Sequence, residues 1–294
     1  MNYEGRKLLH SLTLLDRFLF AEVMEDASAY RAVLEIILER DIHLKEDVQS
    51  EKEIRTLPNF RGIRLDVWGM NEDGTIYNSE MQKKDTKNLP KRSRFYQSVM
   101  DAGLLEVGET DFNQLNDIWL ITIMPFDLFG LGKFRYTFRM RCDEENSLEL
   151  KDGAVRMFLN TRGQNREEIS DELYAFLKYA ENPTDEMAAA FESEKIKKLH
   201  ERVTKVKRNE ENEVKYMQLW EELVMERNEG RIEGRSEGRS EGREEGIHEG
   251  LDMKAQIVAR NMFMRGMSQE DTAVICGESL EKISGWFEEW GRMK

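Results

Sequence analysis

The segment 62–82 constrains the fold of this chain more than any other part of it. Its first half alternates apolar residues with others, beginning Ile-Arg-Leu-Asp-Val-Trp at residue 63, and a period of two residues predicts a β-strand. A second strand is expected over residues 75–82. Between them, Gly74 suits the left-handed position of a three-residue loop, so the segment predicts a hairpin closed by residues 72–74.

This loop fixes which residues of the two strands face each other. Counting back from it pairs Trp68 with Asn78 and Asp66 with Glu80. Directly opposed carboxylates repel and cost stability, unless a divalent cation lies between them. Glu80 and Gln82 are two residues apart and therefore share one side of their strand. Carboxylate and carbonyl oxygens suit Mg²⁺ or Mn²⁺, so the hairpin predicts a metal site, the alternative being two solvated acids on an exposed sheet face.

Helical and strand patterns flank the hairpin on both sides. Residues 11–41 carry apolar side chains at three- and four-residue spacing, which predicts helix, with a break near Asp26. The order of elements predicts an α/β fold with a small mixed sheet between helices. The remaining expectations are a strand at 48–54, a helix at 90–105, a buried strand at 118–124, alternating aromatic and basic residues at 134–140, a hairpin over 148–160, and helices at 166–180 and 185–228.

The block 83–97 holds six basic residues against the single acid Asp85, in a chain whose net charge is −14. Such a chain repels polyanions as a whole, so contact with nucleic acid needs a local basic patch or a metal ion. The block therefore predicts a surface that follows DNA phosphates, although an ordinary solvated face remains the alternative. Trp68 and Tyr96 are expected in the core and not against bases. The residues assigned to DNA are Lys84, Lys91, Arg92 and Arg94.

Together these segments resemble the PD-(D/E)XK nuclease superfamily, and most closely its Rpn-type recombination-promoting nucleases, often labelled putative transposases. The resemblance covers nearly the whole chain. The segments that carry it are Asp66, the hairpin, Glu80-Met81-Gln82, Arg92-Ser-Arg-Phe-Tyr96, Asp16-Arg-Phe-Leu-Phe20, Phe158-Leu-Asn-Thr161, the Glu-Gly-Arg repeat and the Gly-Met-Ser-Gln-Glu-Asp stretch after it.

The resemblance implies a restriction-endonuclease-like αβββαβ core over residues 1–162 that hydrolyses DNA phosphodiester bonds with Mg²⁺ or Mn²⁺. Asp66 and Glu80 would bind the metal with help from the Met81 backbone carbonyl. Asp16 is a further candidate near the metal, or else a plain surface acid at the start of a helix. Glu22 is its weaker rival.

One position departs from the superfamily pattern. The usual lysine two residues after the glutamate is here Gln82. A glutamine carries no charge and is limited to orienting the water or the phosphate. Lys83 is adjacent in the strand and faces the other way, which leaves Lys84 and Arg94 as candidates to supply the missing charge.

The C-terminal half divides into a helical extension at 163–228, a Glu-Gly-Arg-X repeat at 229–250 and a small helical tail at 251–294. Six glycines in the 22 residues of the repeat each weaken a helix by about 1 kcal/mol, which favours a flexible linker. Their spacing of four residues instead favours a helix that pairs with a second copy, matching Glu to Arg between chains. Both interpretations stay open.

The tail resembles the start of a helix-turn-helix motif, but its last helix, 279–290, is acidic. That charge disfavours the major groove, so an oligomerisation bundle is an equal alternative. Cys142 and Cys276 are far apart and there are four histidines, which argues against zinc and for reduced thiols. No apolar run is long enough to cross a bilayer, and no membrane partner is expected.

The leading hypothesis is a cytoplasmic, Mg²⁺-dependent DNA endonuclease, associated with recombination or mobile elements and homo-oligomeric through its C-terminal helices. The alternative is a catalytically weak, DNA-associated oligomeric scaffold that uses the nuclease fold. A third hypothesis, a transcriptional regulator acting through the tail, is disfavoured by the acidic last helix.

Overall fold

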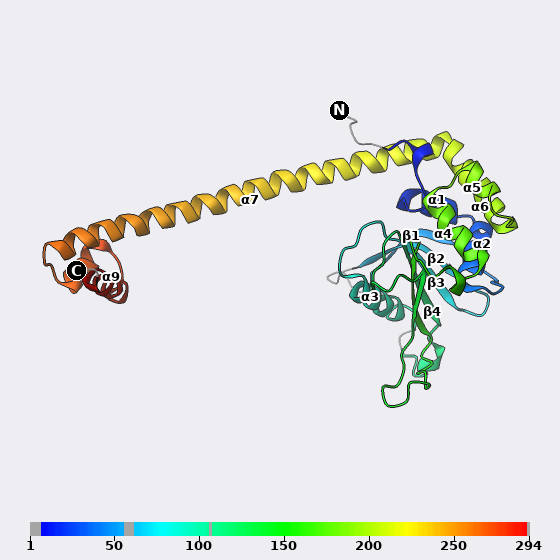
Figure 1. The fold of residues 1–294 in the computed structure, drawn as a ribbon, viewed down its shortest axis with the longest axis horizontal. Coiled ribbons are helices and arrows are strands. Elements are labelled where there is room, and N and C mark those ends of the chain that lie inside the picture. The colour runs from blue at the N-terminus through cyan, green and yellow to red at the C-terminus, as the bar shows by residue number, and fades with distance from the viewer. Residues whose placement is uncertain (1–6, 56–61, 106–107, 293–294) are drawn as a thin grey trace. The chain divides into compact units, whose positions relative to one another are not determined.

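The structure is a computed structural model that describes residues 7–55, 62–105 and 108–292. The chain forms two compact units, Met1–Gln218 and Leu219–Lys294. The first unit contains the sheet, and the second contains the end of the chain (Figure 1). The division of the chain at residues 162, 228 and 250 stays a prediction.

A six-stranded mixed sheet forms the centre of the first unit, in the order β1-β2-β3-β4-β6-β5. Strand β2 is antiparallel to both of its neighbours, β1 and β3. Strands β3, β4 and β6 run parallel to one another, and β5 is antiparallel to β6. The predicted α/β fold class and its mixed sheet are confirmed. The strands are β1 Gln49–Ile54, β2 Ile63–Met70, β3 Ile76–Met81, β4 Ile118–Met124, β5 Arg135–Phe138 and β6 Ala154–Asn160.

Helices cover both faces of this sheet (Figure 1). Helices α1, α2, α4 and α6 pack on one face through the main apolar core, which includes Val67, Tyr77 and Ile121. Helix α3 packs on the other face against Leu65 and Leu120. The helices of this unit are α1 Arg17–Met24, α2 Ala27–Leu38, α3 Leu89–Asp101, α4 Asp171–Glu181, α5 Asp185–Ala189, α6 Glu194–Arg208 and the start of α7 Glu210–Met264, with short 3-10 turns at Leu9–Ser11, Phe112–Gln114 and Arg166–Glu168.

The predicted hairpin between β2 and β3 is confirmed in its register. Trp68 lies opposite Asn78, and the N–H of Asn71 donates to the carbonyl of Thr75 at 2.8 Å. Gly74 has a φ of +89°, a left-handed conformation that glycine adopts without a steric cost. The loop therefore closes where the sequence places it.

Two of the expected helical segments are divided by capping residues. The helix expected over 11–41 begins at Arg17 and is interrupted at Asp26, whose side chain accepts the N–H groups of Ser28 and Ala29. An aspartate in this position caps a new helix, so the predicted break is confirmed. The segment 185–228 likewise holds three helices, with Ser193 capping α6.

The hairpin predicted over 148–160 is wrong. Strand β6 lies between β4 and β5, parallel to the first and antiparallel to the second. The residues before it turn away to another partner, because Leu150 N–H donates to the carbonyl of Met140 at 3.0 Å. The turn read at Lys151-Asp-Gly153 exists, but it joins β6 to a segment outside the sheet.

Helix α7 continues into the second unit and contains the whole repeat. Residues 229–250 are helical and their side chains are exposed throughout. The end of α7 packs with α8 Gln269–Cys276 and α9 Leu280–Arg292 around a small core that includes Ala259, Ile283 and Phe287. Whether two copies of the chain pair along the repeat stays a prediction.

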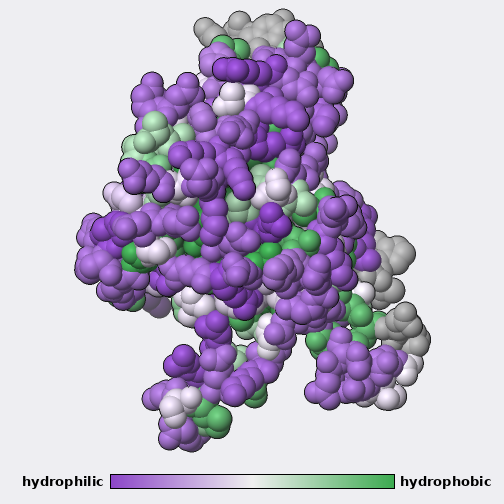
Figure 2. All heavy atoms as spheres, turned by 90° about the vertical axis from the view of Figure 1, so that its right-hand side faces the viewer, coloured by the Kyte–Doolittle hydropathy of each residue, from purple (hydrophilic) through white to green (hydrophobic). Residues whose placement is uncertain are grey.

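The high charge of the chain is carried by its surface. Figure 2 shows one face on which hydrophilic side chains dominate and apolar ones form small separate patches. Among the residues that the structure describes, no helix has both the length and the apolar character that crossing a bilayer requires. Cys142 and Cys276 are both free thiols.

Candidate functional site

The two candidate carboxylates lie where strands β2 and β3 separate. The paired residues of these strands run from Met70 opposite Ile76 to Val67 opposite Ser79. Beyond that point β2 continues beside β1 and β3 continues beside β4. The predicted pair Asp66 and Glu80 therefore occupies the first positions past the end of the ladder.

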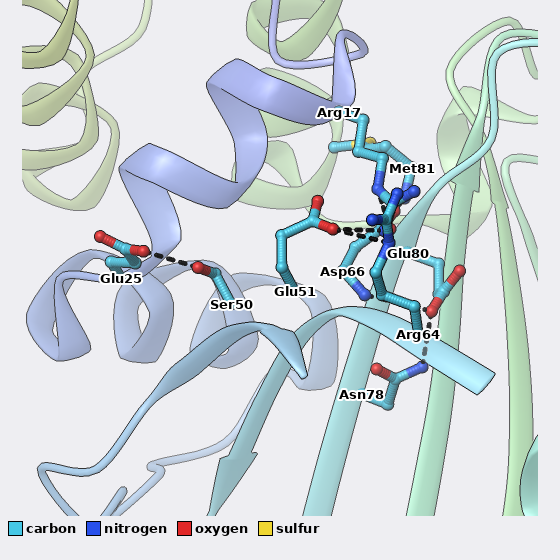
Figure 3. A network of polar contacts seen from close by, with 9 residues as sticks. All are labelled: Arg17, Glu25, Ser50, Glu51, Arg64, Asp66, Asn78, Glu80 and Met81. Atoms are coloured by element: carbon cyan, nitrogen blue, oxygen red, sulfur yellow. Dashed lines mark hydrogen bonds and ion pairs between the residues drawn. The ribbon is translucent and has the colours of Figure 1, made fainter. Parts of the chain in front are cut away.

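Each carboxylate replaces a missing ladder bond by accepting a backbone N–H of the other strand (Figure 3). Oδ2 of Asp66 accepts the N–H of Met81 at 3.0 Å. Oε1 of Glu80 accepts the N–H of Asp66 at 3.3 Å, and the same oxygen accepts Nδ2 of Asn78, also at 3.3 Å. Asp66 and Glu80 are both buried, so these bonds hold the two acids together within the protein.

Burial makes the charged forms of both acids unfavourable. It raises the pKa of Glu80 to about 7, with the neighbouring Asp66 carboxylate as the second cause. Burial also raises the pKa of Asp66, although Arg17 and the Met81 N–H oppose that shift. The repulsion expected for opposed carboxylates is thus present, and a cation beside the pair would relieve it.

In the structure, Asp66 already has a cationic neighbour on α1. Nε of Arg17 lies 2.6 Å from Oδ1 of Asp66, and the same guanidinium donates to Glu51 of β1 at 2.8 Å. Glu51 also pairs with Arg64, at 2.9 Å. Asp66, Arg17, Glu51 and Arg64 therefore form a series of ion pairs with alternating charge beside the site (Figure 3). In the sequence, Arg17 stands out only as the residue after Asp16, and no spacing pattern marks it.

Gln82, which replaces the superfamily lysine, faces an arginine of α3. Nη2 of Arg92 donates to Oε1 of Gln82 at 2.6 Å. Arg92 also lines a very small cavity together with Glu80 and Asn78. The positive charge beside Glu80 therefore comes from Arg92, and no contact of Lys84 or Arg94 with the carboxylates is recorded among the described residues; both side chains are exposed.

Asp16 and Glu22, the other acids considered, have partners elsewhere. Asp16 precedes α1 and pairs with Lys83, just beyond β3. Burial alone would raise the pKa of Asp16, but Lys83 and the N–H of Thr13 reverse this and lower it. Glu22 pairs with Lys215 at 3.4 Å. Asp16 therefore lies near the end of β3 as a paired carboxylate, whereas Glu22 is tied to α7.

The basic side chains on α3 differ in their exposure to solvent. Lys91 and Arg94 are exposed on α3, while Arg92 is partly buried against the site. Trp68 and Tyr96 both pack against the apolar core under α3, where the sequence analysis expected them. Tyr96 also contributes to the site, because it lines the small cavity beside Glu80.

The donor set at the end of the ladder fits a hard divalent cation. Asp66 and Glu80 supply carboxylate oxygens whose mutual repulsion a metal would remove, and oxygen ligands are what Mg²⁺ and Mn²⁺ prefer. Within the described ranges, no cluster of three or more His, Cys, Asp or Glu residues is suited to hold a metal. A metal here would therefore depend on two acids and on further oxygens, such as the Met81 carbonyl or water.

Comparison with known proteins supports the same interpretation. A family model described as "PD-(D/E)XK nuclease family transposase" matches residues 17–225. This span is well over half of the chain. It includes the point where β2 and β3 separate, called the fork below, where Asp66 and Glu80 lie. No curated protein and no solved structure matches the chain.

Proposed function

Because the chain belongs to the PD-(D/E)XK nuclease family transposases, we propose that it is a DNA endonuclease that uses Mg²⁺ or Mn²⁺ to hydrolyse phosphodiester bonds. The single observation that carries this proposal is the buried pair of Asp66 and Glu80 at the end of the β2–β3 ladder. Two acids with raised pKa values in one buried site indicate a functional role, since such a pair destabilises a protein that does not use it.

Each residue of the site has a distinct role in this reaction. Asp66 and Glu80 would hold the metal, with the Met81 carbonyl as a third oxygen. When bound, the metal supplies a water of lowered pKa and neutralises charge on the scissile phosphate. Gln82 orients that water or the phosphate through its amide, while Arg92, which donates to it at 2.6 Å, provides the positive charge that lysine gives in the superfamily pattern.

DNA would approach along α3 and the segment before it. Lys84, Lys91 and Arg94 are exposed there, and among the described residues neither Lys91 nor Arg94 forms an ion pair with an acid. Cations that are not already neutralised by the protein are free to replace the counterions of phosphate groups. The local excess of positive charge supports DNA contact in spite of the net charge of −14.

We also propose that the protein forms a homo-oligomer through α7. The glycines of the repeat recur every fourth residue, and an added Cβ at Gly234, Gly238 or Gly242 would meet no atom within 4 Å apart from the adjacent backbone of its own helix. A second helix has room to approach the backbone at these positions. Glu and Arg residues follow the same spacing, so an offset copy would bring opposite charges together.

A catalytically weak scaffold remains the second candidate, because Arg17 already acts as the counter-ion of the Asp66 carboxylate, where a metal ion would otherwise bind. Its guanidinium lies 2.6 Å from Oδ1 and would compete with a metal for that oxygen. Together with Gln82 in place of lysine, this contact favours slow turnover. DNA binding without metal-dependent cleavage would be the property of such a scaffold.

Plasmid nicking with Mg²⁺, Mn²⁺ or chelator tests the proposal, using the wild type, Asp66→Asn and Glu80→Gln. The amides keep an oxygen for the Met81 and Asp66 N–H groups but lose the charge that holds a metal, so cleavage should be lost while the fold remains. Glu22→Gln is the matched control, because Glu22 pairs with Lys215 and not with the site. Undiminished cleavage by both amide variants would refute the assignment, and DNA binding without cleavage by the wild type would favour the scaffold.

A further inference from the structure

A second, larger cavity shares Arg17 and Arg92 with the candidate site but is not lined by either carboxylate. It measures about 550 Å³ and is lined by Arg17, Arg64, Lys91, Arg92, Phe95 and Tyr96, among others. Its size lies within the range of about 300–1,000 Å³ in which proteins bind small molecules. The cavity is therefore large enough to hold one nucleotide.

Two arginines connect this cavity with the candidate catalytic site. Arg17 is the residue that contacts Oδ1 of Asp66 at 2.6 Å. Arg92 also lines the small cavity that contains Glu80 and donates to Gln82. A DNA strand with a phosphate at the carboxylate pair would thus have its next nucleotide at the larger cavity.

The lining of the cavity combines cations with an exposed aromatic ring. Four of its residues are basic, and two of these, Arg17 and Arg64, are already ion-paired with Asp66 and Glu51. None of the described residues that line the cavity is acidic. Phe95 is 39% exposed, although a phenylalanine on an amphipathic helix is usually buried. Tyr96 is held beneath by the apolar core and lies 5.8 Å from the Arg92 guanidinium. A positively charged groove with a free aromatic face is the combination that binds unpaired nucleotides.

We propose that this cavity binds one unpaired nucleotide of the DNA substrate, with its phosphate against Lys91 and Arg92 and its base stacked on Phe95. The inference rests on the proposed nuclease function and adds a substrate class to it. A base inside a duplex is stacked on both faces and cannot reach Phe95. Extruding it costs a few kcal/mol, and least where the DNA is single-stranded or mismatched. The protein should therefore prefer DNA with unpaired bases near the cut.

Binding is measured by fluorescence anisotropy with a short labelled oligothymidine and with a duplex of equal length, both in chelator so that no cleavage occurs. Phe95→Ala should weaken binding of the single strand by about 5- to 150-fold, the loss expected for one stacked base, and leave duplex binding unchanged. Phe95→Leu, which keeps apolar volume without a flat ring, should lose the same affinity, and Phe95→Trp should keep it. Phe112→Ala, at a phenylalanine that is 72% exposed outside this cavity, is the matched control.

Three results would overturn the inference: no binding of the single strand by the wild type, wild-type affinity in both Phe95→Ala and Phe95→Leu, or an equal loss in Phe112→Ala. Cleavage of the same DNAs with Mn²⁺ separates this inference from the proposed function. If the wild type cleaves and Phe95→Ala binds and cleaves identically, the cavity has no such role and the nuclease assignment stands. If Phe95 contributes to binding but nothing is cleaved, the nucleotide site stands and the nuclease assignment falls.

Discussion

Replacing Glu80 with glutamine should stabilise the metal-free protein above neutral pH. Burial and the Asp66 carboxylate raise the pKa of Glu80 from its ordinary 4.5 to about 7. The folded state therefore keeps a proton that the unfolded state releases, and stability falls as the pH rises from about 4.5 to about 7. Glutamine is never charged and still offers an oxygen to the Asp66 N–H, so the variant escapes this loss.

The pKa difference sets the size of the effect. A change from 4.5 to about 7 corresponds to about 3 kcal/mol in the free energy of unfolding, reached in full above pH 7. For a unit of 150–250 residues, each kcal/mol moves the melting temperature by about 2–4 °C. Glu80→Gln should therefore melt about 6–12 °C above the wild type at high pH and close to it near pH 4.5.

Scanning calorimetry in chelator, at about pH 4.5 and about pH 8, measures this difference. The control is Glu22→Gln, where burial and Glu25 also raise the pKa but the side chain is less deeply buried, so the gain should be smaller. Adding Mg²⁺ at high pH should raise the melting temperature of the wild type and of Glu22→Gln, and not that of Glu80→Gln. Equal melting of wild type and Glu80→Gln at high pH, or a difference that is the same at both pH values, would refute the reasoning.

Three further predictions concern the surroundings of the site and the repeat. Replacing Lys91 and Arg94 with glutamine should weaken DNA binding and reduce the slope of log affinity against log salt by about 2; an unaltered slope in a salt titration would show that DNA does not follow α3. Arg17→Gln should tighten Mn²⁺ binding in calorimetric titration without DNA, because Arg17 competes for Asp66, and weaker binding would contradict this. A triple variant places leucine at Gly234, Gly238 and Gly242. It should gain about 1 kcal/mol of helix propensity at each position and yet dissociate or change oligomer number in sedimentation, whereas an unchanged mass would exclude pairing along the repeat.

The part of the site that local sequence determines could be predicted, and the part that packing determines could not. The alternation of β2, the loop ending at Gly74 and a period of two residues suffice to bring Asp66 and Glu80 together, because all three act within one hairpin. Asn78 follows from the same period, two residues before Glu80, although the sequence analysis did not assign it a role.

Contacts between distant elements required the structure. Arg17 reaches Asp66 only because α1 packs on the sheet, and no local pattern carries that information. Arg92 was assigned to DNA phosphates, whereas its contact with Gln82 depends on how α3 packs near the end of β3. The error at 148–160 has the same origin: a correct turn signal at Gly153 says nothing about which strand β6 joins, and β6 pairs with β4, thirty-six positions earlier in register.

The exchange of backbone bonds at the fork also has an evolutionary consequence. Asp66 and Glu80 each complete the hydrogen bonding of the opposite strand, so an apolar replacement would leave a buried N–H without an acceptor. A descendant of this gene that no longer needed to cut DNA would still be selected to keep oxygen atoms at both positions. Substitutions at Asp66 and Glu80 in such a descendant should give asparagine and glutamine before alanine or valine. Acids that are retained at these two positions in a lineage are therefore only weak evidence that its members still cleave DNA.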